Sequence, residues 1–339
     1  MVSWFKRRYR PQSVLIHAKD HRIGDAFLQV PFFRSARARF PDARITLAVS
    51  LGGTPYATSL RSIIAEFIDE IVENAHLCDD RWQILARERP LGGRHFDLVI
   101  DMQKTWWRTL AIRRIRHRRF ISASKHYLFS SRRPPRPWKP PHLLGQFLKL
   151  LDAAGGEEVM PQAVVRWFGE AERRTAALCI ADGAPAVGFV PGAGEPFKRW
   201  PLERFCAVAR LQIQQRRRAV FVLGPEERDW IDAIQSSVPE ALIPGWRGTG
   251  ACGDALHPLE VAALGERLAA VVTNDCGTAH MLAAGAVPMI ALFGATNPAK
   301  YAPATPVLHV LQRASKGADA IKAISIEDVT DRLDALLFD

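Results

Sequence analysis

Short apolar runs alternate with amphipathic stretches along most of the chain. The run SVLIHA at 13–18 is typical of a buried strand, and apolar residues recur at helical spacing in 26–40. Pro31 lies inside this second stretch, so we expect the helix to be kinked there or to begin its regular part late. A second strand is predicted at 43–50. This succession of strand, helix and strand predicts a crossover between parallel strands, and hence a parallel sheet.

The same alternation continues and divides the chain into two series of comparable length. The proline-rich segment 132–141 can be neither a helix nor a central strand. We predict two domains, 1–168 and 169–339, and expect the closing amphipathic helix at 325–338 to pack back on the first domain. The other predicted helices are 58–67, 142–156, 170–183, 201–215, 225–238, 257–268 and 278–285, and the other predicted strands are 69–74, 96–102, 186–192, 219–224, 241–246, 269–275 and 287–294.

Composition narrows the class of protein. With 339 residues, 48% of them hydrophobic and 24% charged, the chain has a globular composition. Its longest uncharged stretch in the second half, 276–299, contains glycines and prolines, so we do not expect a transmembrane helix. The N-terminus lacks the apolar core of a secretory signal, and we therefore expect a cytoplasmic protein. The five cysteines are scattered and lack a CxxC spacing, which predicts neither a disulfide framework nor a zinc site.

The positive charge of the chain is concentrated in one segment. The net charge is +11, and the segment from Lys104 to Lys139 alone holds twelve Lys or Arg residues and no Asp or Glu. Four more basic residues near the N-terminus are interleaved with aromatic ones: Lys6, Arg7, Arg8 and Arg10. Nucleic acid, anionic lipid and a phosphorylated substrate are all compatible with this pattern. The basic segment could equally be a solvated surface whose arginine stems cover apolar groups.

Three polar loops follow predicted strands, which is where open parallel sheets bind their ligands. The first loop, 19–25, ends in Gly24 and Asp25. Gly24 permits close approach of the backbone. Asp25 has two interpretations: it caps the following helix, or it projects into a cleft as a general base.

The second loop, 191–201, combines glycines with paired cations. Lys198 and Arg199 come just before a helix, which together with open backbone N–H groups favours an anion site. The loop has neither the GxxxxGK[ST] phosphate loop nor the GxGxxG dinucleotide motif. A structural turn would explain the glycines but not the two cations.

The third loop, 273–280, opens a predicted helix whose N-terminus would attract a phosphate. Taken singly, His280 would be an ordinary packed histidine and Asp275 an ordinary cap. The coincidence of three such loops is a stronger signal than any one of them.

The ordered motifs in these loops resemble glycosyltransferase family 9, the lipopolysaccharide heptosyltransferases. The resemblance covers nearly the whole chain and is specific for the family, but much less so for the donor or acceptor sugar. The motifs that carry it are RIGD at 22–25, PGAG at 191–194 with KRWP at 198–201, and NDCGTAHMLAAG at 274–285 with PMIALFGATNP at 288–298; FDLVIDMQ at 96–103, HLLGQFLKLLDAAG at 142–155 and IKAISIEDVTDRL at 321–333 are also similar.

The resemblance implies an α/β fold of the GT-B type, with two Rossmann-like domains facing across a cleft and the donor held mainly by the C-terminal one. Asp25 matches the family's proposed catalytic base, Lys198 the lysine at the donor diphosphate, and Glu226 the acid near the ribose. The other positions implied for donor binding are Gly192, Gly194, Asp275, Cys276, Gly277, Thr278 and His280, and those expected to bind the acceptor or another anion are Lys19, Arg22, Lys104 and Arg108.

The implied reaction is inverting transfer of a heptose, or a related sugar, from ADP-heptose to a lipopolysaccharide core or related glycolipid. Asp25 would deprotonate the acceptor hydroxyl, which attacks as the diphosphate leaves. No DxD motif is present, so we expect neither a metal nor another cofactor. Two departures from the family pattern bear on recognition: Cys276 stands where a Ser or Thr is usual, and the first loop reads HAKDHRIGD.

Two other functions remain open from the sequence. The chain could use a different nucleotide-sugar donor, or it could be a noncatalytic protein that binds anionic surfaces or nucleic acid. Retention of Asp25 and Lys198 counts against the latter, so we expect no nucleic-acid partner. Peripheral contact with the cytoplasmic face of the inner membrane is compatible with the basic segment. Trp106, Trp107 and Trp138 would suit sugar stacking, the membrane interface or core packing.

Overall fold

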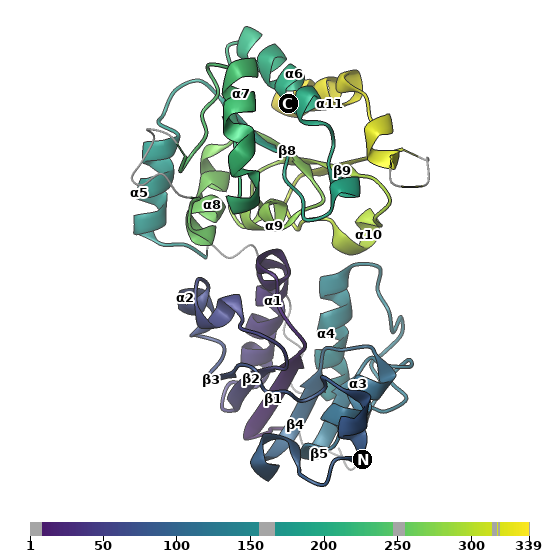
Figure 1. Cartoon of the computed structure of the whole chain (residues 1–339). Coiled ribbons are helices and arrows are strands. Elements are labelled where there is room, and N and C mark those ends of the chain that lie inside the picture. The colour runs from purple at the N-terminus through teal and green to yellow at the C-terminus, as the bar shows by residue number, and fades with distance from the viewer. Residues whose placement is uncertain (1–8, 156–166, 247–254, 314–316, 318, 339) are drawn as a thin grey trace, which may run out of the picture. The chain divides into compact units, whose positions relative to one another are not determined.

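The computed structural model describes residues 9–155, 167–246, 255–313, 317 and 319–338. The chain forms two compact units, one of residues 1–22 and 29–162 and the other of residues 23–28 and 163–339. The predicted domain limits, 1–168 and 169–339, stay a prediction. Each unit is an α/β structure with its own sheet (Figure 1).

The first sheet is entirely parallel, with strand order β3-β2-β1-β4-β5. Val14 pairs with Ile45 on one side and Leu98 on the other, and all three side chains are fully buried. Such apolar runs are expected where helices cover both faces of a parallel sheet. The elements are β1 (Ser13–Ala18), α1 (Ile23–Arg39), β2 (Arg44–Val49), α2 (Arg61–Ile64), β3 (Glu70–Val72), β4 (His95–Asp101), α3 (Trp106–Ile112), β5 (Arg116–Ser122) and α4 (Leu143–Ala154), with 3-10 turns at 55–57, 81–85 and 90–93.

The second sheet is also parallel, with order β10-β9-β8-β6-β7. Phe189 and Phe221 stack in its core at a centroid distance of 5.3 Å. The predicted pair of Rossmann-like domains is thus confirmed. The elements are α5 (Glu170–Cys179), β6 (Ala186–Val190), α6 (Leu202–Gln214), β7 (Arg218–Phe221), α7 (Ile231–Ser237), α8 (Pro258–Leu264), β8 (Ala270–Asn274), α9 (Gly277–Ala283), β9 (Met289–Phe293), α10 (Pro298–Tyr301), β10 (Leu308–Gln312) and α11 (Ile326–Phe338), with 3-10 turns at 196–198, 225–230, 265–267 and 320–323.

The expectation that α1 begins late is wrong. The helix begins at Ile23 and continues through Pro31 to Arg39. Proline removes one backbone hydrogen bond from a helix. Phe27, Phe32 and Phe33 surround Pro31 and are at most 1% exposed, so their burial compensates for the missing bond.

Several elements differ from the sequence pattern: α3, α10 and β10 were not predicted, and three other segments show how tertiary context decides the outcome. The predicted strand 241–246 makes a single parallel bridge, Val220 to Leu242, before Pro244 and Gly245 turn the chain away. The predicted helix 58–67 is reduced to the single turn α2. Strand β5 lies inside the basic segment and was not predicted, because its first half is basic and only its second half is buried.

The closing helix α11 packs within the second unit. It contacts α6 and the strands β8, β9 and β10, and its Val329 and Leu333 are fully buried in that unit's core. Its apolar face is thus occupied by the second unit's own core, and the expectation that this helix packs on the N-terminal domain stays a prediction.

Gly265 sets the distance between α8 and the segment after α9. A Cβ atom placed on it would lie 2.4 Å from the carbonyl oxygen of Leu282 and 3.0 Å from the Cα atom of Gly285. We expect Gly265→Ala to lower the free energy of unfolding by about 1 to 3 kcal/mol through overpacking. Denaturant unfolding of the full chain measures this loss. Gly169→Ala, whose Cβ would meet only the flexible Glu172 carboxylate, is the control, and an equal loss in both variants would contradict the packing argument.

Candidate functional site

The loop after β6 is shaped by a buried carboxylate. A Cβ atom on Gly192 would lie 2.4 Å from Oε1 of Glu227, so a larger residue there would have to displace this carboxylate. Glu227 accepts a hydrogen bond from the Gly224 N–H at 2.9 Å, and burial raises its pKa. Its neighbour Glu226, predicted at the ribose, is exposed, as is Gly194 in the loop itself. Glu226 is thus the exposed acid, whereas the structural role belongs to the buried Glu227, which no sequence motif marks.

Asn274, the last residue of β8, joins two loops. Its side-chain amide donates to the carbonyl oxygen of Pro191 at 2.7 Å, and its Oδ1 accepts from the backbone N–H of Trp200 at 3.1 Å. The indole of Trp200 in turn donates to the carbonyl oxygen of Ile324 at 2.9 Å. Asn274 is fully buried, so both ends of the loop 191–201 are fixed from inside the unit.

Lys198 and Asp275 meet in an ion pair. The lysine Nζ lies 2.8 Å from Oδ2 of Asp275, and the side chains are 25% and 8% exposed respectively. The interpretation of Asp275 as a helix cap is wrong, because Cys276 occupies the N-cap position of α9 and makes no side-chain cap. The second and third loops therefore come together at the carboxyl edge of the second sheet, as their order after β6 and β8 predicted.

The remaining predicted residues of the third loop lie in the short helix α9. Gly277, Thr278 and His280 are half-buried there. The Sγ atom of Cys276 lies 3.6 Å from the hydroxyl of Thr273, and burial raises the pKa of the thiol. Cys276 is therefore a neutral thiol, a weaker hydrogen-bonding group than the hydroxyl usual at this position.

Asp25 is an exposed carboxylate in the first turn of α1, not the N-cap. The N-cap position belongs to Arg22, which is also exposed and makes no side-chain cap. Lys19, at the start of the loop, lies 3.4 Å from Asp20 in a solvent-accessible ion pair. Because such pairs are weak, the Lys19 ammonium can exchange Asp20 for another anion.

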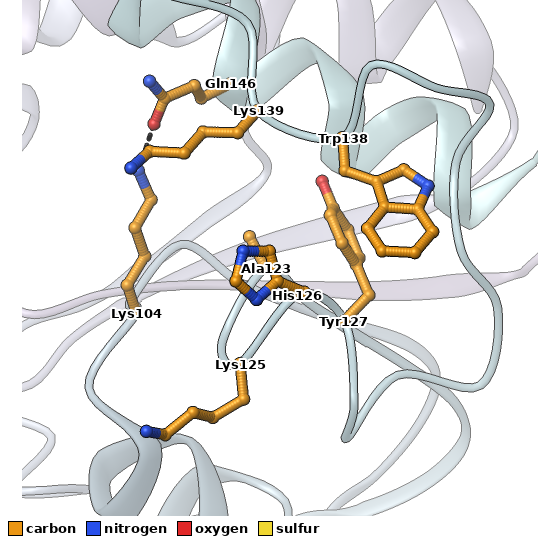
Figure 2. A pocket seen from close by; sticks show the side chains of 8 residues that line it. All are labelled: Lys104, Ala123, Lys125, His126, Tyr127, Trp138, Lys139 and Gln146. Atoms are coloured by element: carbon orange, nitrogen blue, oxygen red, sulfur yellow. Dashed lines mark hydrogen bonds between the residues drawn. The ribbon is translucent and has the colours of Figure 1, made fainter.

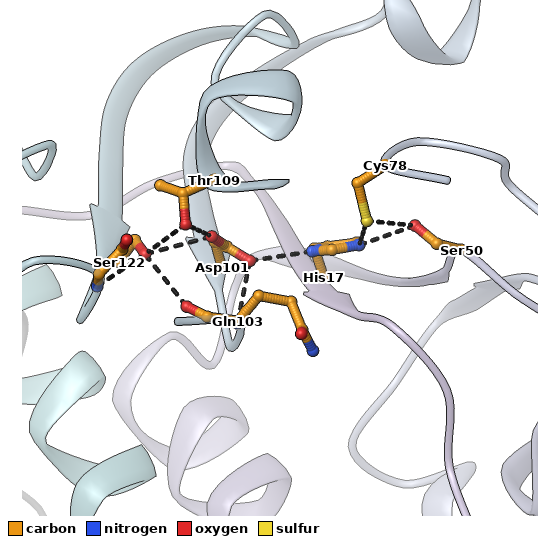
Figure 3. Close-up of polar contacts among 8 residues, drawn as sticks. His17, Ser50, Cys78, Asp101, Gln103, Thr109 and Ser122 are labelled. Atoms are coloured by element: carbon orange, nitrogen blue, oxygen red, sulfur yellow. Dashed lines mark hydrogen bonds and ion pairs between the residues drawn. The ribbon is translucent and has the colours of Figure 1, made fainter. Parts of the chain in front are cut away.

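A buried charge pair lies at the carboxyl end of the first sheet (Figure 3). Nδ1 of His17 is 3.0 Å from Oδ1 of Asp101, and Nε2 is 2.9 Å from the hydroxyl of Ser50. Thr109 and Ser122 donate to the other oxygen of Asp101 at 2.7 and 3.1 Å. Burial alone would lower the pKa of His17, but Asp101 and Cys78 raise it to about 9, so the ring is protonated at neutral pH.

This pair positions the loop after β4. Asp101 accepts from the backbone N–H of Gln103 at 3.0 Å, and Ser122 donates to the Gln103 carbonyl at 3.3 Å. Ser124 donates to the carbonyl of Lys104 at 3.1 Å. Lys104 itself donates to Gln146 and lines a cavity in the first unit.

Several arginines of the basic segment hold the fold together. Arg114 donates to the carbonyls of residues 83, 86 and 88, and Arg119 donates to the Ala154 carbonyl at 2.8 Å. Arg108, predicted to bind an anion, places its guanidinium 4.9 Å from the centre of the Trp107 ring. The interpretation of the basic segment 104–139 as a structural surface thus accounts for some of its arginines. The N-terminal residues Lys6, Arg7 and Arg8 lie outside the described residues, whereas Arg10 is exposed.

Within the described residues, no cluster of three or more His, Cys, Asp or Glu side chains is arranged to hold a metal ion. No described helix is both long and apolar enough to cross a membrane.

The sequence of this chain matches one protein family and several of its characterised members. The model of glycosyltransferase family 9 (heptosyltransferase) matches residues 84–327. The chain is 24% identical over 336 residues to lipopolysaccharide heptosyltransferase 3 of Escherichia coli K12, covering 91% of this chain and 95% of that protein.

Solved structures match over almost the whole chain. A family 9 glycosyl transferase of Veillonella parvula matches with a TM-score of 0.71 and 21% identity, over 96% of this chain and 97% of that one. An Escherichia coli heptosyltransferase solved with ADP-2-deoxy-2-fluoro heptose matches with a TM-score of 0.64 and 16% identity, over 95% and 99% of the two chains. These likenesses confirm the GT-B fold class.

The protonated state of His17 gives a pH dependence with a definite sign. A pKa raised from 6.5 to about 9 stabilises the folded state fully below pH 6.5, and this contribution is lost as the pH rises through 9. We expect it to amount to at most about 3 kcal/mol. Unfolding at pH 6.5 and 9.5 should show the loss in the wild type but not in His17→Asn. His95→Asn, at an exposed position, should keep the wild-type profile; equal profiles in all three proteins would exclude His17 as the source.

Proposed function

The chain belongs to glycosyltransferase family 9, whose model matches well over half of it, and on this premise we propose that it transfers a heptose from ADP-heptose to a lipopolysaccharide core or related glycolipid. Because the chain belongs to a glycosyltransferase family, it is an enzyme and not a noncatalytic binding protein. Within this activity, the alternatives are transfer of a sugar related to heptose and use of another nucleotide-sugar donor.

The observation that carries the proposal is the junction of Lys198 and Asp275. The two residues come from loops after β6 and β8, and their 2.8 Å ion pair is partly exposed on the lysine side. A diphosphate held at this edge would share the lysine with Asp275. Lys198 would then stabilise the charge that develops on the leaving diphosphate, while Asp275 keeps the ammonium in place.

The donor loop offers further polar groups for the nucleotide sugar. Thr278 and His280 lie in α9, close in sequence to Asp275 of the ion pair, and Glu226 is an exposed carboxylate at the turn after β7. We assign Glu226 to the ribose, and Gly192, Gly194, Cys276 and Gly277 to the loops that surround the donor. The similar Escherichia coli enzyme solved with an ADP-heptose analogue supports ADP as the nucleotide.

Asp25 is proposed as the general base. Its side chain is exposed in the first turn of α1, where a substrate hydroxyl can reach it. Deprotonation of an acceptor hydroxyl by Asp25 would let that oxygen attack the anomeric carbon, as the bond to the diphosphate breaks on the opposite face. The anomeric configuration is then inverted. This scheme uses no metal ion and no other cofactor.

We assign acceptor binding to the first unit because this unit carries the basic segment. Lys19, Arg22, Lys104 and Arg108 are proposed to bind phosphate or carboxylate groups of the core oligosaccharide. The relative named as lipopolysaccharide heptosyltransferase 3 supports this substrate class. We propose that the enzyme works in the cytoplasm, with the basic segment touching the anionic face of the inner membrane where a glycolipid acceptor would be presented.

Nucleotide selectivity tests the donor assignment. Calorimetric titration with ADP, UDP, GDP and NAD should show selective binding of ADP, and Lys198→Ala should weaken it about 10- to 100-fold, since a charged hydrogen-bonding partner is lost. Lys322→Ala removes an exposed cation of the same unit and should leave binding unchanged. Selective binding of UDP or GDP would overturn the donor, and binding of none of the four nucleotides would overturn the proposed function.

The role of Asp25 is tested by turnover. Asp25→Asn should lower kcat about 10²- to 10⁴-fold, because a general base is lost, while ADP affinity stays at the wild-type value. Release of ADP from ADP-heptose in the presence of a heptose-deficient core oligosaccharide measures the rate. Asp20→Asn is the matched control, since Asp20 is an exposed carboxylate in the same loop. A similar loss of rate in both variants would point to the charge of the loop and not to a base.

A further inference from the structure

A cavity of about 230 Å³ opens at the carboxyl ends of β4 and β5 in the first unit (Figure 2). Its lining comes from three segments: the loop after β4, the loop after β5, and the residues that lead into α4. Pockets for drug-sized ligands span about 300–1,000 Å³, so this one fits a smaller group, of the size of one sugar. The lining residues are Lys104, Ala123, Lys125, His126, Tyr127, Trp138, Lys139 and Gln146.

The charge of the lining is of one sign. Lys104, Lys125 and Lys139 contribute three ammonium groups, and none of the described lining residues is an Asp or a Glu. Lys104 donates to the side-chain oxygen of Gln146, which is itself fixed by hydrogen bonds to the carbonyls of residues 140 and 141 at 2.8 and 3.1 Å. One of the three cations is therefore held in place, and the cavity favours an anion of high charge.

Tyr127 provides the observation that points to a ligand. Its side chain is only 2% exposed and lines the cavity, yet its hydroxyl has no hydrogen-bond partner among the described residues. Burial raises the pKa of this phenol, which therefore keeps its proton and acts as a donor. A buried polar group without a partner is costly, and a ligand oxygen in the cavity would satisfy it.

The backbone that carries Tyr127 is strained. Lys125, His126 and Tyr127 have φ angles of 47°, 55° and 63°, three consecutive left-handed residues with side chains. The loop is fastened to β5 by Ser130, whose hydroxyl accepts from the N–H of Ser122 at 2.8 Å and donates to its carbonyl at 2.6 Å. Strain of this kind persists only where the surroundings enforce it, and it concentrates at ligand sites.

Trp138 forms an aromatic wall. The guanidinium groups of Arg133 and Arg136 lie 5.3 and 5.0 Å from the centre of its ring and hold the indole in place. Figure 2 shows the rings of Tyr127 and Trp138 on one side of the cavity, and Lys104, Lys139 and Gln146 on the other. The cavity thus has an aromatic side that suits a sugar ring and a cationic side that suits its charged substituent.

We propose that this cavity binds a phosphorylated sugar unit, with the phosphate at Lys104 and Lys139 and the ring against Tyr127 and Trp138. The phenol donates its hydrogen bond to an oxygen of that sugar. Lysine binds phosphate as a point charge, and three lysines suit a dianion better than a carboxylate. If the proposed function holds, the unit is a phosphorylated residue of the acceptor, and this part of the inference rests on that function.

Binding of simple sugar phosphates to the full-length protein tests the proposal. Titration with glucose 6-phosphate, followed by calorimetry and tryptophan fluorescence, should show binding. The affinities for glucose, inorganic phosphate and glucuronate should each be at least ten-fold lower. Tyr127→Phe should weaken the binding of glucose 6-phosphate about 3- to 10-fold, and Lys139→Ala about 10-fold or more. Arg113→Ala removes an exposed cation of the same basic segment outside the cavity and should have no such effect.

Other outcomes overturn the proposal. If inorganic phosphate binds as tightly as glucose 6-phosphate, the cavity is a general anion site. If glucuronate binds as tightly, the cavity does not select a phosphate group. Equal weakening by Arg113→Ala would assign the effect to overall charge. Binding only to vesicles with anionic lipid would assign the segment to a membrane. ADP titration of each variant separates this proposal from the proposed function, because ADP affinity should not change when the cavity is altered.

Discussion

Leaving a buried polar group without a partner is costly, and in each unit a buried polar side chain at the end of one strand meets this constraint by bonding to the loops around it. Asp101 ends β4 and Asn274 ends β8, and each strand lies next to the first strand of its sheet. The two residues therefore occupy corresponding positions, each at the carboxyl end of a strand beside the first strand of its parallel sheet. Both are fully buried, and each bonds to the backbone of a loop that follows a strand: Asp101 to Gln103, and Asn274 to Pro191 and Trp200.

The two units meet this constraint with different chemistry. The first unit buries a charged pair, His17 and Asp101, which is costly to bring out of water and costly to break. Its hydrogen bonds extend to Gln103 and, through Ser122 and Ser124, to the carbonyl of Lys104. The second unit uses a neutral amide and leaves its ion pair, Lys198 with Asp275, at the edge of the site. A lysine on the partly exposed side of such a pair can take an additional anionic partner, whereas the buried pair can only support its surroundings.

The sequence predicted what repeats locally and missed what depends on distant contacts. Apolar strands and the loops after them were predictable because hydrophobic period and turn residues are local signals. The bond between Asn274 and Trp200 joins positions 74 residues apart, and the clash that fixes Gly192 involves Glu227, so neither has a local signature. The left-handed turn at 125–127 contains no glycine and reads as an ordinary basic loop. Strand β5 escaped prediction because charge on its first half hides the period of two.

Part of the basic segment forms strand β5, and its charges there have a role that is unrelated to ligand binding. It is an edge strand, and such an edge offers unpaired backbone groups to any other chain. Its second half is covered by the returning loop, through the bonds of Phe120 with Ser131 in both directions. Its first half presents Arg116 and Arg118, both exposed, to solvent. Their like charges repel the same edge of another molecule, so part of the chain's positive charge protects the enzyme against aggregation through its own sheet.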